Sequence, residues 1–146
     1  MGEDEGAAEL ARTISARMDA ASIYALLGIH LLSAERGKVE LAVTCDARHA
    51  NVDGAVHGGF LCLVADTAMG FAVRSEIDRS WQNRTVNLNI DWFSGARVGD
   101  RICARAMVEH AASRFRWASV ELLNDQGAVI CKAHSLNSVR PPESTG

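Results

Sequence analysis

The sequence predicts an α+β fold in which one antiparallel sheet covers a long central helix. Three observations support this prediction. The order of segments is helix, strand, helix and then four strands. The links between the last strands have hairpin length, which favours antiparallel pairing. The central helix is apolar on all sides, so a sheet face must cover it.

The N-terminal part of the chain predicts an amphipathic helix. Over residues 7–27 apolar side chains recur every three or four positions. We expect this helix to break near Ala20 and to stop at Gly28, because glycine commonly ends helices. The predicted parts are an N-terminal helical segment at 1–22, a main domain at 23–140 and a flexible tail at 141–146.

The period changes to two at Gly37, which predicts a half-buried strand that carries Val39, Leu41 and Val43 on one face. The next segment, "ARHANVDGAVHGG", is rich in the residues of loops. It leads into a run from Gly58 to about Glu76 whose apolar residues point to every side. We therefore predict a central helix that is covered over most of its surface.

The remaining segments alternate as strands do. The stretch "RTVNLNIDWF" is predicted to place two sets of side chains on opposite faces, namely Val86, Leu88, Ile90 and Trp92 against Thr85, Asn87, Asn89 and Asp91. The stretch "RICARAMVEH" alternates in the same way. "FRWASVELL" and "AVICKAHSLNSV" flank "NDQG", which is typical of a hairpin turn.

Composition excludes several classes of protein. The 146 residues are 48% hydrophobic, which suits a single domain, and the formal net charge is −3 with Lys and Arg scattered. We therefore expect no nucleic-acid partner. No segment of about 18 uncharged apolar residues and no secretory signal pattern are present, so we expect a cytoplasmic protein that does not bind a membrane. Four cysteines far apart predict free thiols and no metal site.

One motif makes the chain recognisable. It consists of Asn51, Gly54, the run His57-Gly58-Gly59 and then Asp66-Thr67-Ala68. With "LLGIHL", "TVNLNIDWFSGARVGD" and "NDQGAVICKA" elsewhere, the chain resembles the hot-dog-fold acyl-CoA thioesterases of the PaaI-like and 4-hydroxybenzoyl-CoA thioesterase kind. The resemblance covers roughly residues 23 to 140. It implies a hot-dog fold, a back-to-back homodimer that is often a dimer of dimers, and hydrolysis of an acyl-CoA or aryl-CoA thioester without a cofactor.

The start of the central helix suits the carbonyl of such a substrate. Gly58 and Gly59 lie where backbone N–H groups lack helical partners and the helix dipole is positive. Without a Cβ there, an acyl group can approach the backbone closely. The resemblance implies that the Gly58 N–H donates to the oxyanion, with help from His57. The bland alternative is that both glycines only permit a tight turn into the helix.

Asp66 is the candidate general base or nucleophile, and the sequence does not separate the two roles. A buried carboxylate without partners costs several kcal/mol, so Asp66 must be hydrogen-bonded, protonated or at the mouth of a polar pocket. Its structural alternative is an ion pair with Arg74 or a bond to a strand residue. Desolvation would raise its pKa and a partner's helix N-terminus would lower it, so the net direction stays open.

Helix geometry separates the two halves of the motif. His57 and Asp66 are nine residues apart, which is about 13 Å of rise along a helix. The two residues cannot hold one carbonyl within a chain. Either the site does not use both, or two antiparallel copies of the helix bring Gly58 of one subunit beside Asp66 of the other.

Other residues complete the predicted site. Asn51 matches a family position that orients the water or the leaving sulfur, and its alternative is a plain Asx turn. Thr85 could hold the attacking water, or it is an ordinary strand threonine. Gly59, Leu61 and Met69 are predicted to contact the substrate.

The prediction is therefore an acyl-CoA thioesterase. Two alternatives stay open: a non-catalytic acyl-CoA-binding sensor, which would not need a carboxylate at Asp66, and a hot-dog dehydratase or hydratase, whose sites resemble a different arrangement of residues.

Overall fold

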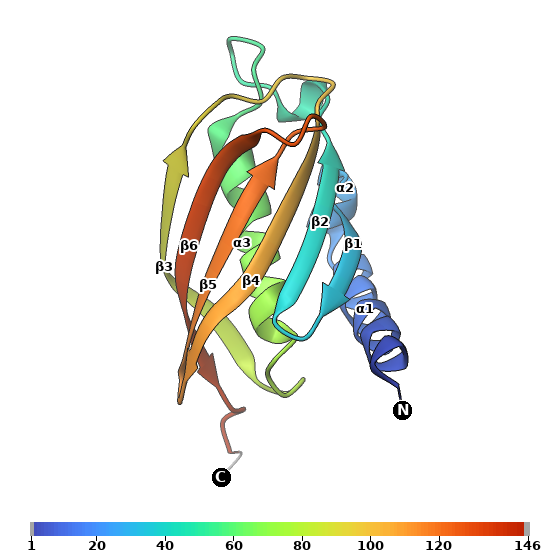
Figure 1. Cartoon of the computed structure of the whole chain (residues 1–146), viewed down its shortest axis with the longest axis vertical. Helices are drawn as coiled ribbons and strands as arrows, with labels where there is room; N and C mark the ends of the chain where they lie inside the picture. Colours follow the sequence, from blue (N-terminus) through green and yellow to red (C-terminus); the bar gives the residue numbers. More distant parts are fainter. Residues whose placement is uncertain (1, 145–146) are drawn as a thin grey trace.

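The computed structural model describes residues 2–144, which form two N-terminal helices, a six-stranded sheet and a central helix (Figure 1). The helices are α1 (Glu3–Asp19), α2 (Ser22–Leu27) and α3 (Gly58–Arg74), with a 3-10 turn at Ala47–His49. The strands are β1 (His30–Glu35), β2 (Lys38–Thr44), β3 (Gln82–Trp92), β4 (Arg101–Ala112), β5 (Phe115–Leu123) and β6 (Val129–Arg140).

The sheet is antiparallel throughout, in the order β1-β2-β4-β5-β6-β3. The five strands expected from the sequence are confirmed, whereas β1 was not predicted. Its side chains do not alternate between buried and exposed positions, and a register shift lies between Leu31 and Ser33. A strand without alternation carries no period-two signal in its sequence.

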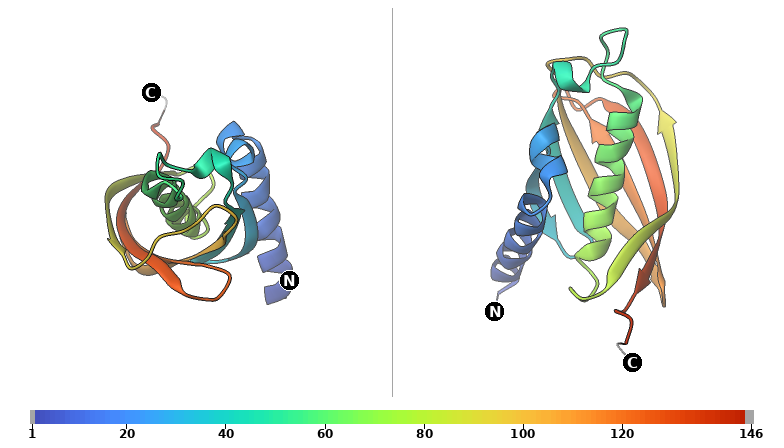
Figure 2. Two further views of the ribbon diagram at one scale, coloured as in Figure 1. Left: turned by 90° about the horizontal axis from the view of Figure 1, so that it is seen from above. Right: turned by 180° about the vertical axis from the view of Figure 1, so that it is seen from behind.

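The sheet curls around α3, which lies in its concave face (Figure 2). Eight of the helix's 17 residues are buried, and the side chains of Val64, Ala68 and Met69 are fully enclosed. Since α3 is covered by β2, β3, β4, β5 and β6, the all-round apolar pattern of its sequence follows from its position.

The N-terminal helices flank the β1 side of the sheet (Figure 2). Gly28 adopts a left-handed conformation with φ 71° and caps α2, which confirms the predicted stop. Ile14 and Met18 of α1 are buried in the same core as α3. The predicted boundary after residue 22 falls in the first turn of α2, and the division into parts stays a prediction. The tail has no regular structure at 141–144, and positions 145 and 146 lie outside the described residues.

A β-bulge in β3 corrects the predicted faces of this strand. Thr85 pairs with Asn137 and Asn87 pairs with Leu136, so Val86 is an extra residue. Because one inserted residue shifts the alternation, the two sides of the bulge are out of phase. After the bulge Leu88 and Ile90 pack against the core as one face, and before it Thr85 and Asn83 contact α3. Thr85 therefore points inward, and Val86, predicted to share a face with Leu88 and Ile90, is 58% exposed.

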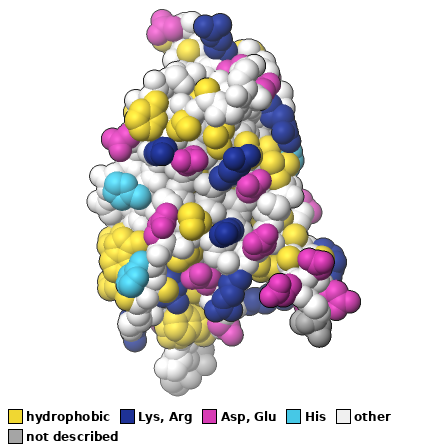
Figure 3. Space-filling model, viewed as in Figure 1, with side chains coloured by type: hydrophobic (Ala, Val, Ile, Leu, Met, Phe, Trp, Pro, Cys, Tyr) yellow, Lys and Arg dark blue, Asp and Glu magenta, His cyan; other side chains and the backbone are white. Residues whose placement is uncertain are grey.

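The outer face of the sheet carries alternating charges (Figure 3). One row crosses five strands through paired positions, namely Glu40, Arg105, Glu121, Lys132 and Asp91. Ion pairs join Arg105 to Glu40 at 3.3 Å and Lys132 to Glu121 at 3.1 Å. Because the signs alternate, this face has no basic stripe of the kind that binds nucleic acid.

Two further findings concern the chain between residues 2 and 144. None of its helices is both long and apolar enough to cross a membrane. All four cysteines are free thiols there, as predicted.

Candidate active site

Asp66 lies in the middle of α3 and is bound by the edge strand β3. The Thr85 hydroxyl donates to Asp66 Oδ1 at 2.8 Å. This contact exists because the bulge at Val86 turns Thr85 inward, which is how bulges re-aim side chains next to active sites. Of the two structural alternatives for Asp66, the bond to a strand residue is therefore formed, whereas no ion pair joins Asp66 to Arg74 among the described residues.

Behind Thr85 lies a chain of polar groups that sequence reasoning missed. Asn137 Oδ1 is 3.4 Å from the Thr85 hydroxyl, and the Asn137 amide donates to Ser135 Oγ at 2.7 Å. Thr85 has one proton and gives it to Asp66, since that contact is shorter. Asn137 and Ser135 are 0% and 1% exposed. Their only sequence signal is polarity at inward positions of β6, where the pattern calls for apolar residues.

A groove of about 180 Å³ opens beside Asp66. Its other walls are Tyr24, Thr67, Gly70, Phe71, Arg74, Asn83 and Thr85. The Asn83 amide donates to the Gly70 carbonyl at 3.2 Å, which fixes β3 to the helix at this point. Asp66 and Thr85 therefore present a hydrogen-bonded carboxylate to an open, polar space.

The other half of the motif forms the start of α3. His57 is the N-cap residue, and its Nδ1 accepts from the Gly59 N–H at 2.8 Å. When the ring is neutral, its proton is therefore on Nε2, where it can be donated outward. The exposed imidazole is held in place by this cap and by its own backbone N–H, which donates to the His49 carbonyl at 2.7 Å.

The Gly58 N–H has no acceptor among residues 2–144. It is one of the four unpaired donors at a helix start, where the dipole favours negative charge. The Trp92 indole lies next to it, because a Cβ built on Gly58 would be 3.7 Å from Trp92 Cη2 and Cζ2. Trp92 is 46% exposed, so an aromatic surface lies beside this free donor.

Asn51 holds the loop before α3. Its Oδ1 accepts from the N–H groups of Asp53 at 2.9 Å and Ala55 at 3.1 Å, and this is the Asx turn that the sequence left as an alternative. The carbonyl oxygen is therefore engaged in the loop, and the amide nitrogen is the part of the side chain that remains to bind a substrate. A direct role for Asn51 stays a prediction.

The predicted substrate-binding residues fall into two groups. Gly59 is exposed at the start of α3, directly under the His57 ring. Leu61 and Met69 are 2% and 0% exposed and pack in the core. Contact of these three residues with a substrate stays a prediction.

Two other side chains near the site have structural surroundings. His49 is buried, accepts from the Asp46 N–H through Nδ1 and stacks on Phe60 with ring centroids 4.2 Å apart, so it supports the loop under His57. Cys62 lies on α3, and burial raises the pKa of its thiol. A thiol that stays protonated is a weak nucleophile.

The site residues thus form two clusters on one chain. Asp66 and Thr85 form one cluster, and His57, Gly58 and Trp92 form the other. Because α3 runs without a break from residue 58 to residue 74, Gly58 and Asp66 are about 12 Å apart along its axis.

Solved structures define the class of this fold. The PaaI protein from the phenylacetic acid degradation operon of Escherichia coli superposes with a TM-score of 0.83 at 23% identity. The superposition covers 90% of this chain and 94% of that chain. With the six-stranded sheet around α3, this likeness confirms the predicted α+β hot-dog fold.

Sequence comparisons then give the family. A profile of the thioesterase superfamily matches residues 53–131, which is more than half of the chain. Acyl-coenzyme A thioesterase 13 of Homo sapiens is 30% identical over 116 residues, covering 79% of this chain and 82% of that protein. A Pseudomonas aeruginosa protein described as an esterase is 33% identical over 82 residues; the match spans 56% of this chain and 61% of that relative. The chain belongs to the thioesterase superfamily, and the predicted resemblance and enzyme class are confirmed at that level.

Proposed function

We propose that this protein hydrolyses acyl-CoA thioesters, including aryl-CoA thioesters, to the free acid and CoA. Asp66 is the general base or the nucleophile, and the Gly58 N–H donates to the oxyanion with His57 beside it. The observation that carries the proposal is the pair of clusters on α3. One presents a carboxylate with a bound hydroxyl, and the other presents an unpaired N–H at a helix start.

The chemistry balances by either route. As a base, Asp66 removes a proton from water while the water oxygen attacks the thioester carbon. The C–S bond then breaks, and the CoA sulfur takes a proton as it leaves. As a nucleophile, the Asp66 oxygen displaces the CoA thiolate and forms an anhydride, which water cleaves. The Thr85 hydroxyl orients the carboxylate in both routes.

The position of the two clusters supports a homodimer that shares each site between its subunits. Each cluster includes a residue of β3. Thr85 of this strand contacts Asp66, and Trp92 of the same strand lies beside Gly58. The other edge of this 11-residue strand pairs with no strand among the described residues. If two β3 strands pair antiparallel about a point between Leu88 and Asn89, Thr85 of each chain faces Trp92 of the other. That register brings the two unlike clusters together twice per dimer.

Three finer predictions belong to this proposal. They are a dimer of dimers, a cytoplasmic location, and catalysis without metal or cofactor. A sensor that only binds acyl-CoA would need the Gly58 donor but no carboxylate, so the Asp66–Thr85 contact favours the enzyme. A dehydratase or hydratase stays a less favoured alternative.

Release of free thiol from a panel of acyl-CoA and aryl-CoA esters tests the function. We expect turnover of at least one ester, and a loss of about 10³-fold in kcat for Asp66→Asn on the best one. An inert wild-type protein, or full activity in Asp66→Asn, would refute the assignment.

Complementation between chains tests the shared site. Asp66→Asn and Gly58→Pro are each expected to be inactive as homodimers. When the two variants are co-expressed with different tags and the mixed dimer is purified, one of its two sites has both wild-type clusters. We expect about half of the wild-type activity per dimer, and a mixed dimer that stays inactive contradicts the shared site.

A further inference from the structure

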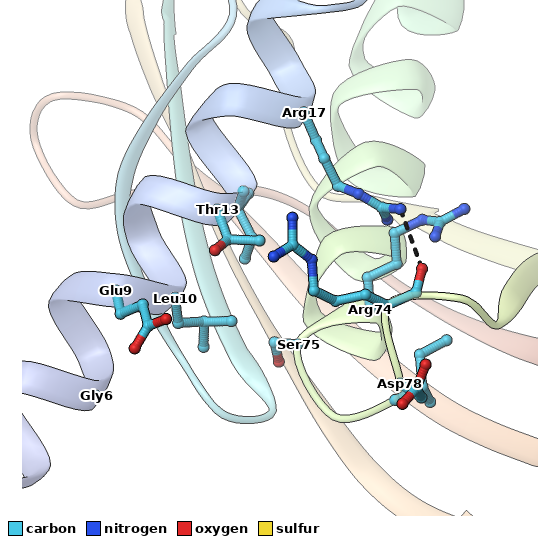
Figure 4. Close-up of a pocket in the computed structure, with 11 residues that line it drawn as sticks. Gly6, Glu9, Leu10, Thr13, Arg17, Arg74, Ser75 and Asp78 are labelled. Carbon is cyan, nitrogen blue, oxygen red and sulfur yellow. Dashed lines mark hydrogen bonds between the residues drawn. The ribbon is translucent and has the colours of Figure 1, made fainter. Parts of the chain in front are cut away.

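Three arginines surround a second pocket beside the candidate active site. Its volume is about 300 Å³, and it lies between α1 and the segment that follows α3. Arg17 of α1, Arg74 at the end of α3 and Arg79 in the next segment all line it (Figure 4). The pocket therefore gathers guanidinium groups from parts of the chain that are far apart in sequence.

Within residues 2–144 these guanidinium groups lack anionic partners. No carboxylate lies within 4.0 Å of Arg17, Arg74 or Arg79 across the part of the chain that the structure describes. Glu9 and Asp78 also line the pocket, but Figure 4 shows Glu9 at the left beside Leu10 and Asp78 below Arg74, both away from Arg17. Asp78 is turned to Ser80, whose hydroxyl and N–H both donate to it.

The positive charges of Arg17 and Arg74 lie close enough to act on each other, and the backbone of Arg79 is bonded to Arg17. Arg17 Nη2 donates to the Arg79 carbonyl at 3.3 Å, which fixes α1 against the segment after α3. Arg74 is half-buried, and both its burial and the nearby charge of Arg17 lower its pKa. Repulsion between the exposed Arg17 and the half-buried Arg74 is a cost that a bound anion would offset.

The pocket also adjoins the groove at Asp66. Arg74 lines both spaces, and Leu10, Ile14 and Ile77 add apolar walls to the second one. Arg74 follows Asp66 by eight residues of the same helix, which is about 12 Å. A ligand whose reacting carbonyl lies at Asp66 can therefore place a distal group among the arginines.

We propose that Arg17, Arg74 and Arg79 bind an anionic group of the thioester substrate, a phosphate or a carboxylate. This rests on the proposed function. Two parts of the substrate could supply the group. The nucleotide phosphates of CoA are about thirteen bonds from the sulfur, or roughly 15 Å when extended. A carboxylate at the far end of a ten-carbon acyl chain reaches roughly 10 Å.

Matched substrates separate the two sources. Decanoyl-CoA carries the phosphates only, decanoyl-pantetheine carries neither anion, and sebacoyl-CoA carries both the phosphates and a terminal carboxylate. The test variant is Arg17→Gln with Arg79→Gln. Arg12→Gln is the control, because Arg12 is an exposed arginine of α1 that lines neither space.

If the phosphates are bound, we expect KM of the double variant to rise about tenfold or more for both CoA esters and to stay unchanged for decanoyl-pantetheine. If the carboxylate is bound, KM rises for sebacoyl-CoA alone. Either pattern supports the site, provided that Arg12→Gln behaves as wild type. Equal KM values for wild type and double variant with all three substrates overturn it.

A purely structural role for the arginines gives a different result. Loss of the hydrogen bond from Arg17 to the Arg79 carbonyl would lower the melting temperature and reduce activity equally on all three esters. That result also overturns the proposal. The single variant Arg79→Gln keeps this hydrogen bond, because its acceptor is the backbone carbonyl of residue 79. A change in KM in that variant therefore does not come from loss of the bond.

Direct binding separates failure of this site from failure of the proposed function. Isothermal titration with CoA and with sebacoyl-CoA, carried out with every protein in an Asp66→Asn background so that the ester stays intact, measures affinity separately from turnover. If no ester is hydrolysed but the double variant still binds either ligand tenfold more weakly than Arg12→Gln, the anion site stands while the enzyme assignment fails. If esters are hydrolysed but the affinities are unchanged, the enzyme assignment stands while the anion site fails.

Discussion

Replacing Gly58 by proline removes one hydrogen atom from the candidate site and leaves the fold in place. Proline has no N–H, and the Gly58 N–H has no acceptor among the described residues, so no bond within the chain is lost. Gly58 is the first residue of α3, where proline is well tolerated. The preceding His57 has φ −64° and ψ 128°, which suits a residue before proline.

The expected magnitudes follow from these contacts. We expect the free energy of unfolding to change by no more than about 1 kcal/mol, because the ring replaces no bonded group and restricts the unfolded chain. The loss of one oxyanion donor costs about 10²- to 10³-fold in kcat, or roughly 3 to 4 kcal/mol. Activity and stability should therefore separate clearly in this variant.

Gly58→Ala is the matched control, since it adds a Cβ but keeps the N–H. That Cβ would lie 3.7 Å from Trp92, which is ordinary van der Waals contact. The assay is kcat on the best ester for both variants, with urea unfolding as the check on the fold. If Gly58→Pro is as active as Gly58→Ala, the N–H is not the oxyanion donor and the proposed mechanism is refuted.

Three further predictions concern groups around the site and the core. Thr85→Val should lower kcat about tenfold on the best ester, while Thr85→Ser keeps the hydroxyl and most of the activity; equal rates would rule out a positioning role. Gly59→Ala should destabilise the protein by about 1 kcal/mol in thermal unfolding, because its Cβ would meet the His57 ring at 3.0 Å and displace the cap, and an unchanged melting temperature would contradict this. Burial raises the thiol pKa of Cys45 and Cys131 to about 11 from an ordinary 9.0, so both stay protonated in the fold while the unfolded chain ionises. Their contribution to stability is therefore complete below pH 9 and is lost as the pH rises toward 11, by up to about 3 kcal/mol per thiol. Urea unfolding at pH 8 and pH 10 checks this, and Cys131→Ala should reduce the loss.

The sequence alone determined most of the fold and the spacing of the motif along one helix. The all-round apolar helix required a covering sheet, and the hairpin-length links made that sheet antiparallel. The spacing of Gly58 and Asp66 already placed the two clusters at different heights of one helix. These features are local and periodic, so they can be read without knowing which segments meet.

Only the tertiary structure decided what surrounds the two clusters. The bulge at Val86 puts Thr85 on the inner side of β3 and turns it toward Asp66, but one unpaired residue leaves the period-two pattern of the sequence intact around it. The contact of Trp92 with Gly58 likewise depends on how β3 crosses the helix. Register and crossing are set by long-range pairing, which periodicity does not encode.

The arginine pocket has the same origin. Arg17, Arg74 and Arg79 carry no common motif in the sequence, where they read as scattered surface charges. They meet because α1 packs beside the sheet and its Arg17 donates to the carbonyl of Arg79. The sequence determined that these charges exist, and the packing of one helix against a distant segment decided that they lie together.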